Sequence, residues 1–368
     1  MKVLFVATVV STHLKVFHIP YLKWFKEQGW EVHIAANIDD DMPFCDKKYN
    51  ISIQRSPFKV ANIKAYQQLK KIIEEEKYDL VHCHTPMGGI LGRLCSRKQR
   101  KSGMKVLYTA HGFHFYKGAP VLNWLMYYPM EKICSYMTDG LITINQEDYT
   151  LAKKKMRAKN IYYIPGIGVD TKKFADTVID REQKRAELGI PDNAVMLLSV
   201  GELIKRKNHE VIIRAVVKLN NPNIHYYIAG QGEIEKYLSE LIKQFNLSDN
   251  VHLLGYRTDV AELYKSSDIF CLPSIHEGLP MALMEAMISG LPCVVSNIRG
   301  NTDLIEGGKS GFLCDSQNVN DFVTAINMLV RNENMKNIMG EYNKLAVQKF
   351  DLGNVMEEME KIYKECVQ

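Results

Sequence analysis

The chain has 368 residues, of which 46% are hydrophobic and 24% are charged. This composition is typical of a folded globular protein and excludes a disordered tail, a collagen-like chain and a coiled coil. At roughly 150 residues per domain, the length predicts two or three domains. No stretch reaches the roughly 18 uninterrupted apolar residues of a membrane-spanning helix, which argues against an integral membrane protein.

The net charge of +5 is unevenly distributed. Residues 1–170 contain 25 lysines and arginines and 15 acidic residues, a net charge of +10, whereas the remainder carries −5. A basic front half indicates an anionic partner, for which nucleic acid, an anionic membrane surface and a phosphorylated lipid are all candidates. The eight cysteines show no C-x-x-C spacing, which favours a reducing cytoplasm over a disulfide framework.

The first half alternates between strand and helix patterns. Residues 2–10 form an apolar run, and we interpret it as a buried strand, because a helix pattern rather than a small-residue cleavage site follows it. Helices are predicted at 17–25, ending before Gly29, and at 61–76. Further strands are predicted at 31–37, 78–84, 105–110 and 140–144. This order predicts a doubly wound α/β domain with a mostly parallel sheet.

A second, similar series starts near residue 195. It predicts strands at 194–200, 224–229, 251–254, 269–272 and 292–295, with a helix at 209–219. The lysine-rich stretch 169–192 is interpreted as a hinge. We therefore expect two doubly wound domains, 1–170 and 171–350, that face each other across a cleft. Ligands in such sheets bind at the carboxyl ends of the strands, so the cleft is the predicted site.

Two nucleotide-binding motifs are absent. The turn after the first strand, 8–13, and the turn after Val200, 201–206, both lack G-x-G-x-x-G, which disfavours a nicotinamide-dependent dehydrogenase. A Walker A loop is also missing. The Gly230-Gln231-Gly232 segment predicts, first of all, a tight turn between a strand and a helix.

The strongest motif lies at 274–286. A strand ends at Pro273, a loop carries Glu277, and Pro280 suits the first turn of a helix. The free N–H groups of that turn and the helix dipole would make a diphosphate site. Glu277 and Glu285 stand eight residues apart, roughly 12 Å along a helix. One carboxylate could hold sugar hydroxyls and the other ribose hydroxyls. The alternative is two solvated glutamates, one of them a charge at a helix N-terminus.

With its flanking residues, this pair resembles the E-x7-E signature of family 4 of the retaining glycosyltransferases, which have the two-domain GT-B fold. The resemblance extends over essentially the whole chain. The matching segments are the T-x-H-G-F turn at 109–113, the interdomain segment at 168–170 with Phe174, the diphosphate-binding turn at 200–203 with Lys207 and His209, and the base-binding loop at 254–259. Residues 110–120 and 127–129 are most similar to EpsD-type enzymes of bacterial capsule and exopolysaccharide assembly.

The resemblance implies roles for individual residues. Glu285 would hold the ribose, Lys207 would neutralise the leaving diphosphate, and His111 would bind the transferring sugar near its anomeric centre. Glu277 would hold the donor sugar together with backbone groups, and the loop at 256–257 would pack on the base. The implied donor-binding residues are Arg206, Gly230, Tyr256, Arg257, Gly278, Leu279, Pro280, Met281 and Glu285, and the implied catalytic residues are His111, Lys207 and Glu277.

Two positions depart from the family pattern. Glu202 stands where many members have an arginine, so Arg206 is the candidate for the second cation, against the alternative of a solvated charge at a helix start. The first turn lacks the common Gly-Gly pair and reads Ser11-Thr12-His13, which are taken as acceptor-side residues. The resemblance also implies that a C-terminal helix, 351–368, crosses back to the first domain.

Other residue clusters have weaker interpretations. His82 and His84 share one face of a strand, but a metal site needs further ligands, and none is evident in the sequence. The basic residues of 153–159 and 93–101 form either a solvated helix face or a surface for anionic lipid. Residues 124–128, from Trp124 to Tyr128, belong either at a bilayer interface or in a buried helix.

The sequence therefore predicts a cytoplasmic glycosyltransferase at the inner face of the plasma membrane. It would transfer a hexose or N-acetylhexosamine from a UDP-sugar to a polyprenyl-diphosphate-linked sugar with retention, and with no metal or cofactor. A UDP-sugar 2-epimerase of the same fold and a non-catalytic scaffold of a polysaccharide complex remain alternatives. A nucleic-acid binder is disfavoured, because interleaved aromatic and basic residues are missing.

Overall fold

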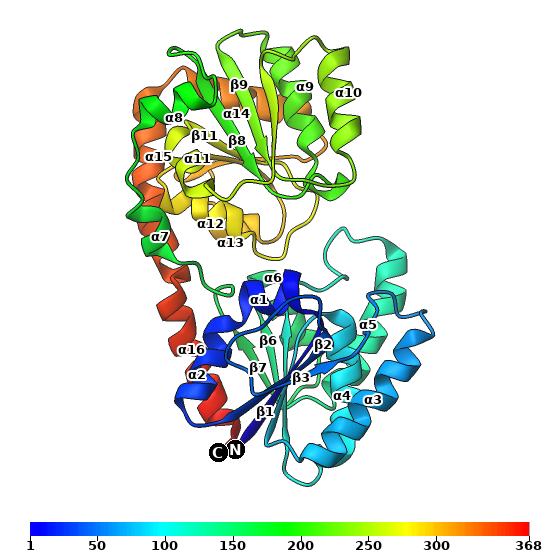
Figure 1. Cartoon of the computed structure of the whole chain (residues 1–368). Helices are drawn as coiled ribbons and strands as arrows, with labels where there is room; N and C mark the ends of the chain where they lie inside the picture. The colour runs from blue at the N-terminus through cyan, green and yellow to red at the C-terminus, as the bar shows by residue number, and fades with distance from the viewer. Residues whose placement is uncertain (368) are drawn as a thin grey trace. The chain divides into compact units, whose positions relative to one another are not determined.

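The computed structural model describes residues 1–367, which form two compact units (Figure 1). The first unit comprises residues 1–167 and the segment that begins at Gly353, and the second comprises Gly168–Leu352. The chain therefore leaves the first unit once and returns to it. The boundaries between the units lie after Ile167 and Leu352, whereas the sequence predicted them after residues 170 and 350.

The first unit is built on a seven-stranded parallel sheet in the order β3-β2-β1-β4-β5-β6-β7. Its strands are β1 (Lys2–Val9), β2 (Glu31–Asn37), β3 (Lys47–Asn50), β4 (Leu80–Cys83), β5 (Lys105–Ala110), β6 (Gly140–Thr143) and β7 (Asn160–Tyr163). The π-helical turn η1 (Val10–Leu14) and the helices α1 (Lys15–Phe17), α2 (Ile19–Glu27), α3 (Ala61–Glu76), α4 (Pro86–Arg100), α5 (Val121–Ser135), α6 (Gln146–Lys155) and α16 (Leu352–Val367) complete the unit.

The central strand β1 shows why this sheet is buried on both faces. Leu4 and Val6 belong to the core that includes residues of α3 and α4, whereas Phe5 contacts the aromatic ring of Phe25 on α2. Successive side chains of a strand point to opposite faces, so an uninterrupted apolar run supplies both layers. The strand order reverses between β1 and β4, which makes their carboxyl ends the switch point where such sheets bind ligands.

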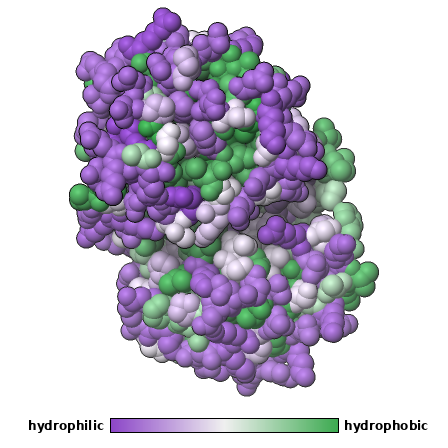
Figure 2. Space-filling model, turned by 45° about the horizontal axis from the view of Figure 1, so that its top comes forward, coloured by the Kyte–Doolittle hydropathy of each residue, from purple (hydrophilic) through white to green (hydrophobic). Residues whose placement is uncertain are grey.

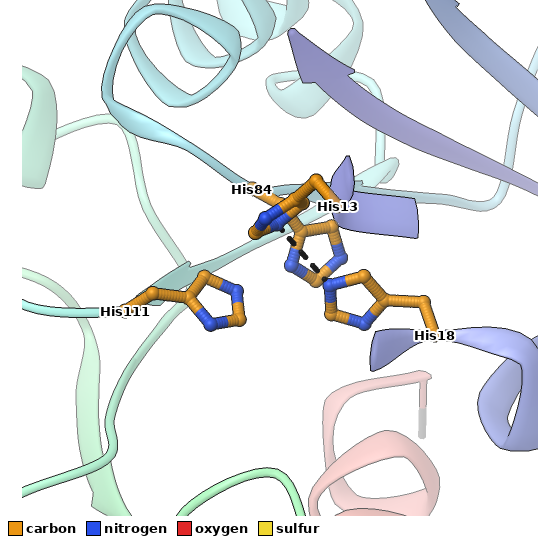
Figure 3. Close-up of side chains that lie close together, drawn as sticks. All are labelled: His13, His18, His84 and His111. Atoms are coloured by element: carbon orange, nitrogen blue, oxygen red, sulfur yellow. Dashed lines mark hydrogen bonds between the residues drawn. The ribbon is translucent and has the colours of Figure 1, made fainter. Parts of the chain in front are cut away.

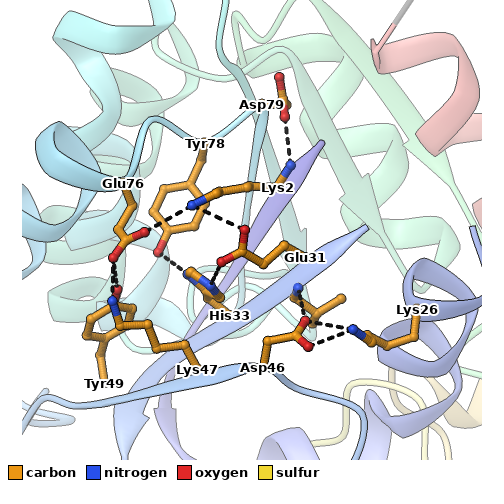
Figure 4. Close-up of polar contacts among 11 residues, drawn as sticks. Lys2, Lys26, Glu31, His33, Asp46, Lys47, Tyr49, Glu76, Tyr78 and Asp79 are labelled. Carbon is orange, nitrogen blue, oxygen red and sulfur yellow. Dashed lines mark hydrogen bonds and ion pairs between the residues drawn. The ribbon is translucent and has the colours of Figure 1, made fainter. Parts of the chain in front are cut away.

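A polar network lies at the amino-terminal ends of strands β1, β2 and β3, opposite the switch point (Figure 4). Lys47 and Lys2 approach the carboxylate of Glu76 at 2.5 and 3.2 Å, and His33 contacts Tyr78 and Glu31, each at 2.8 Å. The hydrogen bond from Lys47 is the main reason that the pKa of Glu76 falls to about 2. These ion pairs tie the strand ends of β1–β3 to the end of α3.

The second unit carries a six-stranded parallel sheet in the order β10-β9-β8-β11-β12-β13. Its strands are β8 (Val195–Val200), β9 (Ile224–Ala229), β10 (Val251–Gly255), β11 (Ile269–Leu272), β12 (Cys293–Ser296) and β13 (Gly311–Cys314). Its helices are α7 (Thr171–Ala175), α8 (Arg181–Glu187), η2 (Lys205–Lys207), α9 (His209–Leu219), α10 (Glu235–Gln244), α11 (Val260–Ser266), α12 (Met281–Ile288), α13 (Asn301–Leu304), α14 (Val319–Val330), α15 (Glu333–Ala346) and η3 (Val347–Phe350). Its switch point lies between β8 and β11.

Three strands are missing from the sequence-based expectations: β3, β7 and β13. All three are edge strands of four residues, and the residues of β3 and β7 are at most half-buried. The slight burial of β3 and β7 explains why their sequences lack the continuous hydrophobic run by which the central strands are recognised. The sequence of β13 is apolar, but the run is only four residues long. The stretch interpreted as a hinge also contains α7 and α8, which begin at the side-chain caps Asp170 and Asp180.

Helix α16 packs its apolar side against the first unit. Tyr363 is 1% exposed, and its ring lies 5.5 Å from that of Trp24 and 4.7 Å from that of Phe25. Its hydroxyl lies 2.9 Å from Nδ1 of His82. None of the described helices is long and apolar enough to cross a membrane.

Replacing Tyr363 tests this anchoring. Tyr363→Ala should lower the free energy of unfolding by about 3–5 kcal/mol, because it leaves a cavity in an aromatic cluster. Tyr363→Phe should lower it by only about 1 kcal/mol, because it removes one hydrogen bond and keeps the ring. All three tryptophans, Trp24, Trp30 and Trp124, belong to the first unit, so urea unfolding followed by tryptophan fluorescence reports on that unit alone.

The matched control is Tyr136→Phe, which alters a tyrosine that is 60% exposed. It should change the unfolding free energy by less than about 0.5 kcal/mol. Equal stability of Tyr363→Ala and the control would contradict the anchoring.

Candidate active site

The second unit contains a pocket of about 550 Å³ at the carboxyl ends of β8, β9 and β10. Gly201 follows β8 and Gly230 follows β9, and both line the pocket. A Cβ atom at Gly230 would lie 1.8 Å from the backbone oxygen of Gly201. The two turns therefore touch backbone to backbone, and this part of the pocket wall is free of side chains. A wall of that kind lets a ligand approach the main chain closely.

Glu285 enters this pocket from α12. The hydroxyl of Tyr264 donates a hydrogen bond to its carboxylate at 3.0 Å. Burial raises the pKa of Glu285 above its ordinary value, and the hydrogen bond from Tyr264 offsets only part of that effect. Burial therefore disfavours the charged form of this carboxylate, and its oxygens can still accept hydrogen bonds from hydroxyl groups of a ligand.

Glu277 lies in the loop between β11 and α12 and is 7% exposed. Its carboxylate oxygens lie 2.7 Å from Nζ of Lys207 and 3.0 Å from a guanidinium nitrogen of Arg206. Burial by itself would raise the pKa of Glu277, but the charges of Lys207 and Arg206 outweigh it and lower the pKa. The pKa values of the two glutamates predicted to share one site are therefore shifted in opposite directions, downward for Glu277 and upward for Glu285.

These contacts decide between two alternatives left by the sequence. The idea of two solvated glutamates is wrong for Glu277, which is buried in an ion pair with both cations. Arg206 also donates to the backbone oxygen of His276 at 2.7 Å, so it is more than a solvated charge at a helix start. Glu202 stands where many family members have an arginine, and it lines the pocket beside Gly201 and Gly230.

The start of α12 adds donors to this region. The helix begins at Met281, one residue later than expected, with Pro280 as the preceding cap residue. The first hydrogen bonds to Pro280 come from the N–H groups of Leu283 and Met284, so those of Met281 and Ala282 precede the helical bonding pattern. A Cβ at Gly300 would lie 2.4 Å from the backbone oxygen of Gly278, which shows how tightly this loop packs.

Arg299 belongs to the same loop cluster and was missed by the sequence analysis. It is 6% exposed, its Nε lies 3.3 Å from the backbone oxygen of Glu277, and its guanidinium lies 2.7 Å from Nε2 of His276. The available signal was its position shortly after β12, the strand adjacent to β11.

The two residues of the predicted base-binding loop differ from each other: Tyr256 is 73% exposed, whereas Arg257 is paired with Asp259.

The first unit gathers its predicted site residues at the switch point of its own sheet. His111 follows β5, and Ser11, Thr12 and His13 lie in η1 after β1. The rings of His13 and His111 meet edge to face at 4.6 Å, next to His18 and His84 (Figure 3). His13 and Thr12 also line a cavity of about 240 Å³ with Arg55. Ser11 instead hydrogen-bonds Asp39 through its N–H and its hydroxyl, at 2.9 and 2.5 Å.

The histidines of this region are neutral at physiological pH. Burial lowers the pKa of His111 to about 4 and that of His82 to about 3. Both ring nitrogens of His82 are engaged, by the hydroxyls of Tyr363 and Thr109, each at 2.9 Å. His111 can therefore offer one N–H donor and one lone pair to a ligand, but no positive charge.

Comparison with known proteins confirms the predicted family and fold. Residues 2–145 match the family described as glycosyl transferase 4-like, and residues 180–346 match glycosyl transferases group 1. The chain is 41% identical to the glycosyltransferase named EpsD of Bacillus subtilis (strain 168), over 98% of this chain and 96% of that protein. It is 33% identical to the Escherichia coli UDP-Gal:alpha-D-GlcNAc-diphosphoundecaprenol alpha-1,3-galactosyltransferase, over 84% of this chain and 81% of that protein.

Solved structures show the same architecture at low identity. The crystal structure of Anabaena Alr3699/HepE in complex with UDP and glucose has a TM-score of 0.82 and 19% identity, covering 99% of this chain and 100% of that one. The lipopolysaccharide glycosyltransferase WaaG gives 0.78 and 17%, covering 98% and 99%. Two units, each with a doubly wound parallel sheet, define the GT-B fold. The chain belongs to the group 1, family 4-like glycosyltransferases, as the motifs predicted.

Because the pKa values of Glu277 and Glu285 are shifted in opposite directions, we expect their replacement by glutamine to have opposite effects on stability. Glu277→Gln should lower the free energy of unfolding by about 3 kcal/mol, the low end for breaking a buried ion pair, because the side chain of Arg206 is 38% exposed. Glu285→Gln should raise the thermal midpoint at pH 7, because it removes a charge that burial disfavours and keeps an acceptor for Tyr264.

The pH dependence provides the control. The lowered pKa of Glu277 contributes stability above pH 4.5 that is lost as the pH falls through the folded-state value. The raised pKa of Glu285 costs stability at neutral pH, and this cost disappears as the pH falls through its folded-state value toward 4.5. The gain from Glu285→Gln should therefore shrink on acidification. Thermal unfolding followed from pH 8 to well below pH 4.5 measures both effects, because the Glu277 contribution is lost only below pH 4.5. Equal shifts in the two variants would contradict the assignment.

Proposed function

We propose that this glycosyltransferase moves a hexose or an N-acetylhexosamine from a UDP-sugar to a polyprenyl-diphosphate-linked glycan, with retention, in capsule or exopolysaccharide biosynthesis. The observation that carries the proposal is the buried carboxylate of Glu277, which pairs with Lys207 and Arg206 in the second unit, the unit whose pocket holds Glu285. The name of the E. coli relative supports a polyprenyl-linked acceptor, and the UDP bound to Anabaena HepE supports the donor.

The donor nucleotide would bind in the pocket lined by Gly201, Gly230 and Glu285. Its ribose hydroxyls would donate to the carboxylate of Glu285, which requires the ionised form for the strongest hydrogen bonds. The exposed ring of Tyr256 at the pocket rim would pack on the uracil base. Because no side chain projects from Gly201 or Gly230, the nucleotide can lie directly against the backbone there.

The diphosphate would sit near the start of α12. The N–H groups of Met281 and Ala282 point out of the first turn, where the helix dipole favours negative charge. Lys207 and Arg206 neutralise Glu277 in this structure, and they would also face the oxygens of the diphosphate. This arrangement stabilises the charge that develops on the leaving group.

Transfer would follow a front-face path. The bond between the anomeric carbon and the diphosphate oxygen breaks, the acceptor oxygen bonds to the same face of that carbon, and the acceptor proton passes to the departing diphosphate. His111, as a neutral imidazole, would hydrogen-bond a hydroxyl of the transferring sugar and orient it. No step requires a metal ion or another cofactor.

A lipid-linked acceptor would require the enzyme to work at a membrane, and the exposed apolar residues of α5 suit such a surface. Val121, Leu122, Leu125 and Ile133 on this helix are 58–74% exposed. Figure 2 shows apolar side chains at the surface along the right-hand edge of the view, on the side where Figure 1 places α5. Trp124 is turned inward and donates to the backbone oxygen of Tyr116 at 3.2 Å, so the aliphatic residues rather than the aromatic ones would enter the bilayer interface.

Nucleotide binding gives the first test. UDP and one or two UDP-sugars should raise the thermal midpoint of the wild-type protein, as expected for ligands that bind only the folded state. Glu285→Gln should abolish this shift while its own midpoint without ligand is raised, so the loss cannot be attributed to poor folding. Below the raised pKa of Glu285 the wild-type shift should also weaken. An unchanged UDP shift in Glu285→Gln would contradict the donor site.

A transfer assay with the UDP-sugar selected in that panel and a lipid-linked N-acetylhexosamine acceptor completes this test. Product with the anomeric configuration of the donor supports the proposal. Consumption of the UDP-sugar without acceptor would instead indicate an epimerase, and UDP-sugar binding without turnover in the presence of acceptor would indicate a scaffold.

Membrane docking through α5 is tested with vesicles. Leu122→Glu and Leu125→Glu together should reduce sedimentation with vesicles containing anionic lipid at least tenfold, because each places a charge where an apolar side chain would enter the interface. Val178→Glu is the matched control, since Val178 is 94% exposed and belongs to the second unit. Equal sedimentation of the double variant and this control would contradict docking through α5.

A further inference from the structure

Four histidines from separate segments converge at the switch point of the first unit (Figure 3). His13 lies in η1 after β1, His18 precedes α2, His84 follows β4 and His111 follows β5. Each can offer a ring nitrogen such that the four atoms all lie within 4.8 Å of one another. The sequence pointed to His84 with His82 as a pair that lacked further ligands, and the fold supplies three.

These rings are short of hydrogen-bond partners. Both ring nitrogens of His84, both of His111 and Nδ1 of His18 are buried and have no hydrogen-bond partner among the described residues. A buried polar atom without a hydrogen-bond partner destabilises a folded protein, so five such atoms in one cluster demand an explanation. The contrast is His82 in the same region, whose two ring nitrogens are both paired.

We propose that His13, His18, His84 and His111 together bind one divalent transition-metal ion of the Zn²⁺ class. A tetrahedral ion with Zn–N bonds of about 2.0–2.1 Å separates its ligand nitrogens by about 3.3–3.4 Å. Nε2 of His13 and Nε2 of His18 already lie 3.4 Å apart. This spacing is long for a hydrogen bond and matches one edge of the tetrahedron.

The chemistry of the cluster selects for this class of ion. Imidazole nitrogen suits Zn²⁺, Cu²⁺ and Ni²⁺, whereas Mg²⁺ and Ca²⁺ prefer carboxylates, which the group of four lacks. Burial lowers the pKa of each ring, so all four have a lone pair to offer at neutral pH. The rings of Phe5 and Phe17 stack on His84 and His111 at 5.7 and 6.0 Å and exclude water around the site.

A second group with ligand-like spacing lacks these properties. Glu31, His33 and Glu76 also lie close together, but their acceptor atoms are already engaged (Figure 4). Lys2 and Lys47 hold the two carboxylates, and His33 uses both ring nitrogens for Tyr78 and Glu31. An ion there would have to displace two lysines, so the two groups offer an internal comparison.

The site has a consequence for catalysis that rests on the proposed function. A metal ion bound by all four rings would take His111 out of contact with the transferring sugar. Zn²⁺ would therefore inhibit transfer, and removal of the ion by a chelator would restore it.

Binding of Zn²⁺ alone to the full-length, chelator-treated protein tests the inference without any nucleotide. Calorimetry and metal analysis after dialysis should give one tightly bound ion per chain. His84→Gln and His18→Gln should each weaken binding at least tenfold, and His225→Gln, a histidine of the second unit that is 7% exposed, should leave it unchanged. Co²⁺ in the wild-type site should show the intense visible absorption of tetrahedral coordination.

Folding of the variants is checked separately. His13→Gln alters a half-buried ligand and should also weaken Zn²⁺ binding, even if the buried variants fold poorly. A retained UDP-induced thermal shift shows that a variant is folded and that the donor site is intact. Absence of Zn²⁺ binding in a wild-type protein that still binds UDP would overturn the metal site and leave the proposed function standing. Unchanged Zn²⁺ binding in all three ligand variants would overturn it as well.

Discussion

The parallel arrangement of both sheets is the constraint on which the rest of this structure depends. Parallel strands place all their carboxyl ends at one edge, and burial of both faces leaves that edge as the place for polar chemistry. The residues predicted from the motifs lie in the turns that follow such ends or in the helices that come after those turns, in one unit or the other. Apolar runs such as β1 and β8 therefore contribute no chemistry themselves, but they decide which loops become neighbours.

Burial then assigns different electrostatic roles to chemically identical residues. Glu277 and Glu285 stand eight residues apart and carry the same carboxylate, yet one is neutralised by two cations and the other has only a tyrosine hydroxyl. The first pairing stabilises the fold. The second leaves a charge in a buried position, an arrangement that costs stability and reserves binding capacity for a ligand.

The histidines of the first unit show the same principle with neutral groups. His82 and His84 are two residues apart on one strand end, and their rings lie 4.1 Å apart. His82 is held between Tyr363 of the returning C-terminal helix and Thr109, whereas the ring nitrogens of His84 lack such partners. The same desolvation thus produces a structural residue at one position and a candidate ligand at the next. His111 belongs to both the catalytic and the metal-binding hypotheses, because its nitrogens are equally unengaged.

The sequence by itself determined the fold class, most central strands and the positions of Glu277, Glu285, Lys207 and His111, because hydrophobic periodicity and short motifs are local properties of the chain. It failed for the edge strands β3 and β7, whose burial is too slight to leave a pattern, and for β13, whose apolar run is only four residues long. Only the tertiary structure decided that Arg206 pairs with Glu277, that Arg299 joins the same loop, and that His18 lies beside His84. Those contacts join residues up to 71 positions apart in the chain, and no local sequence pattern encodes them.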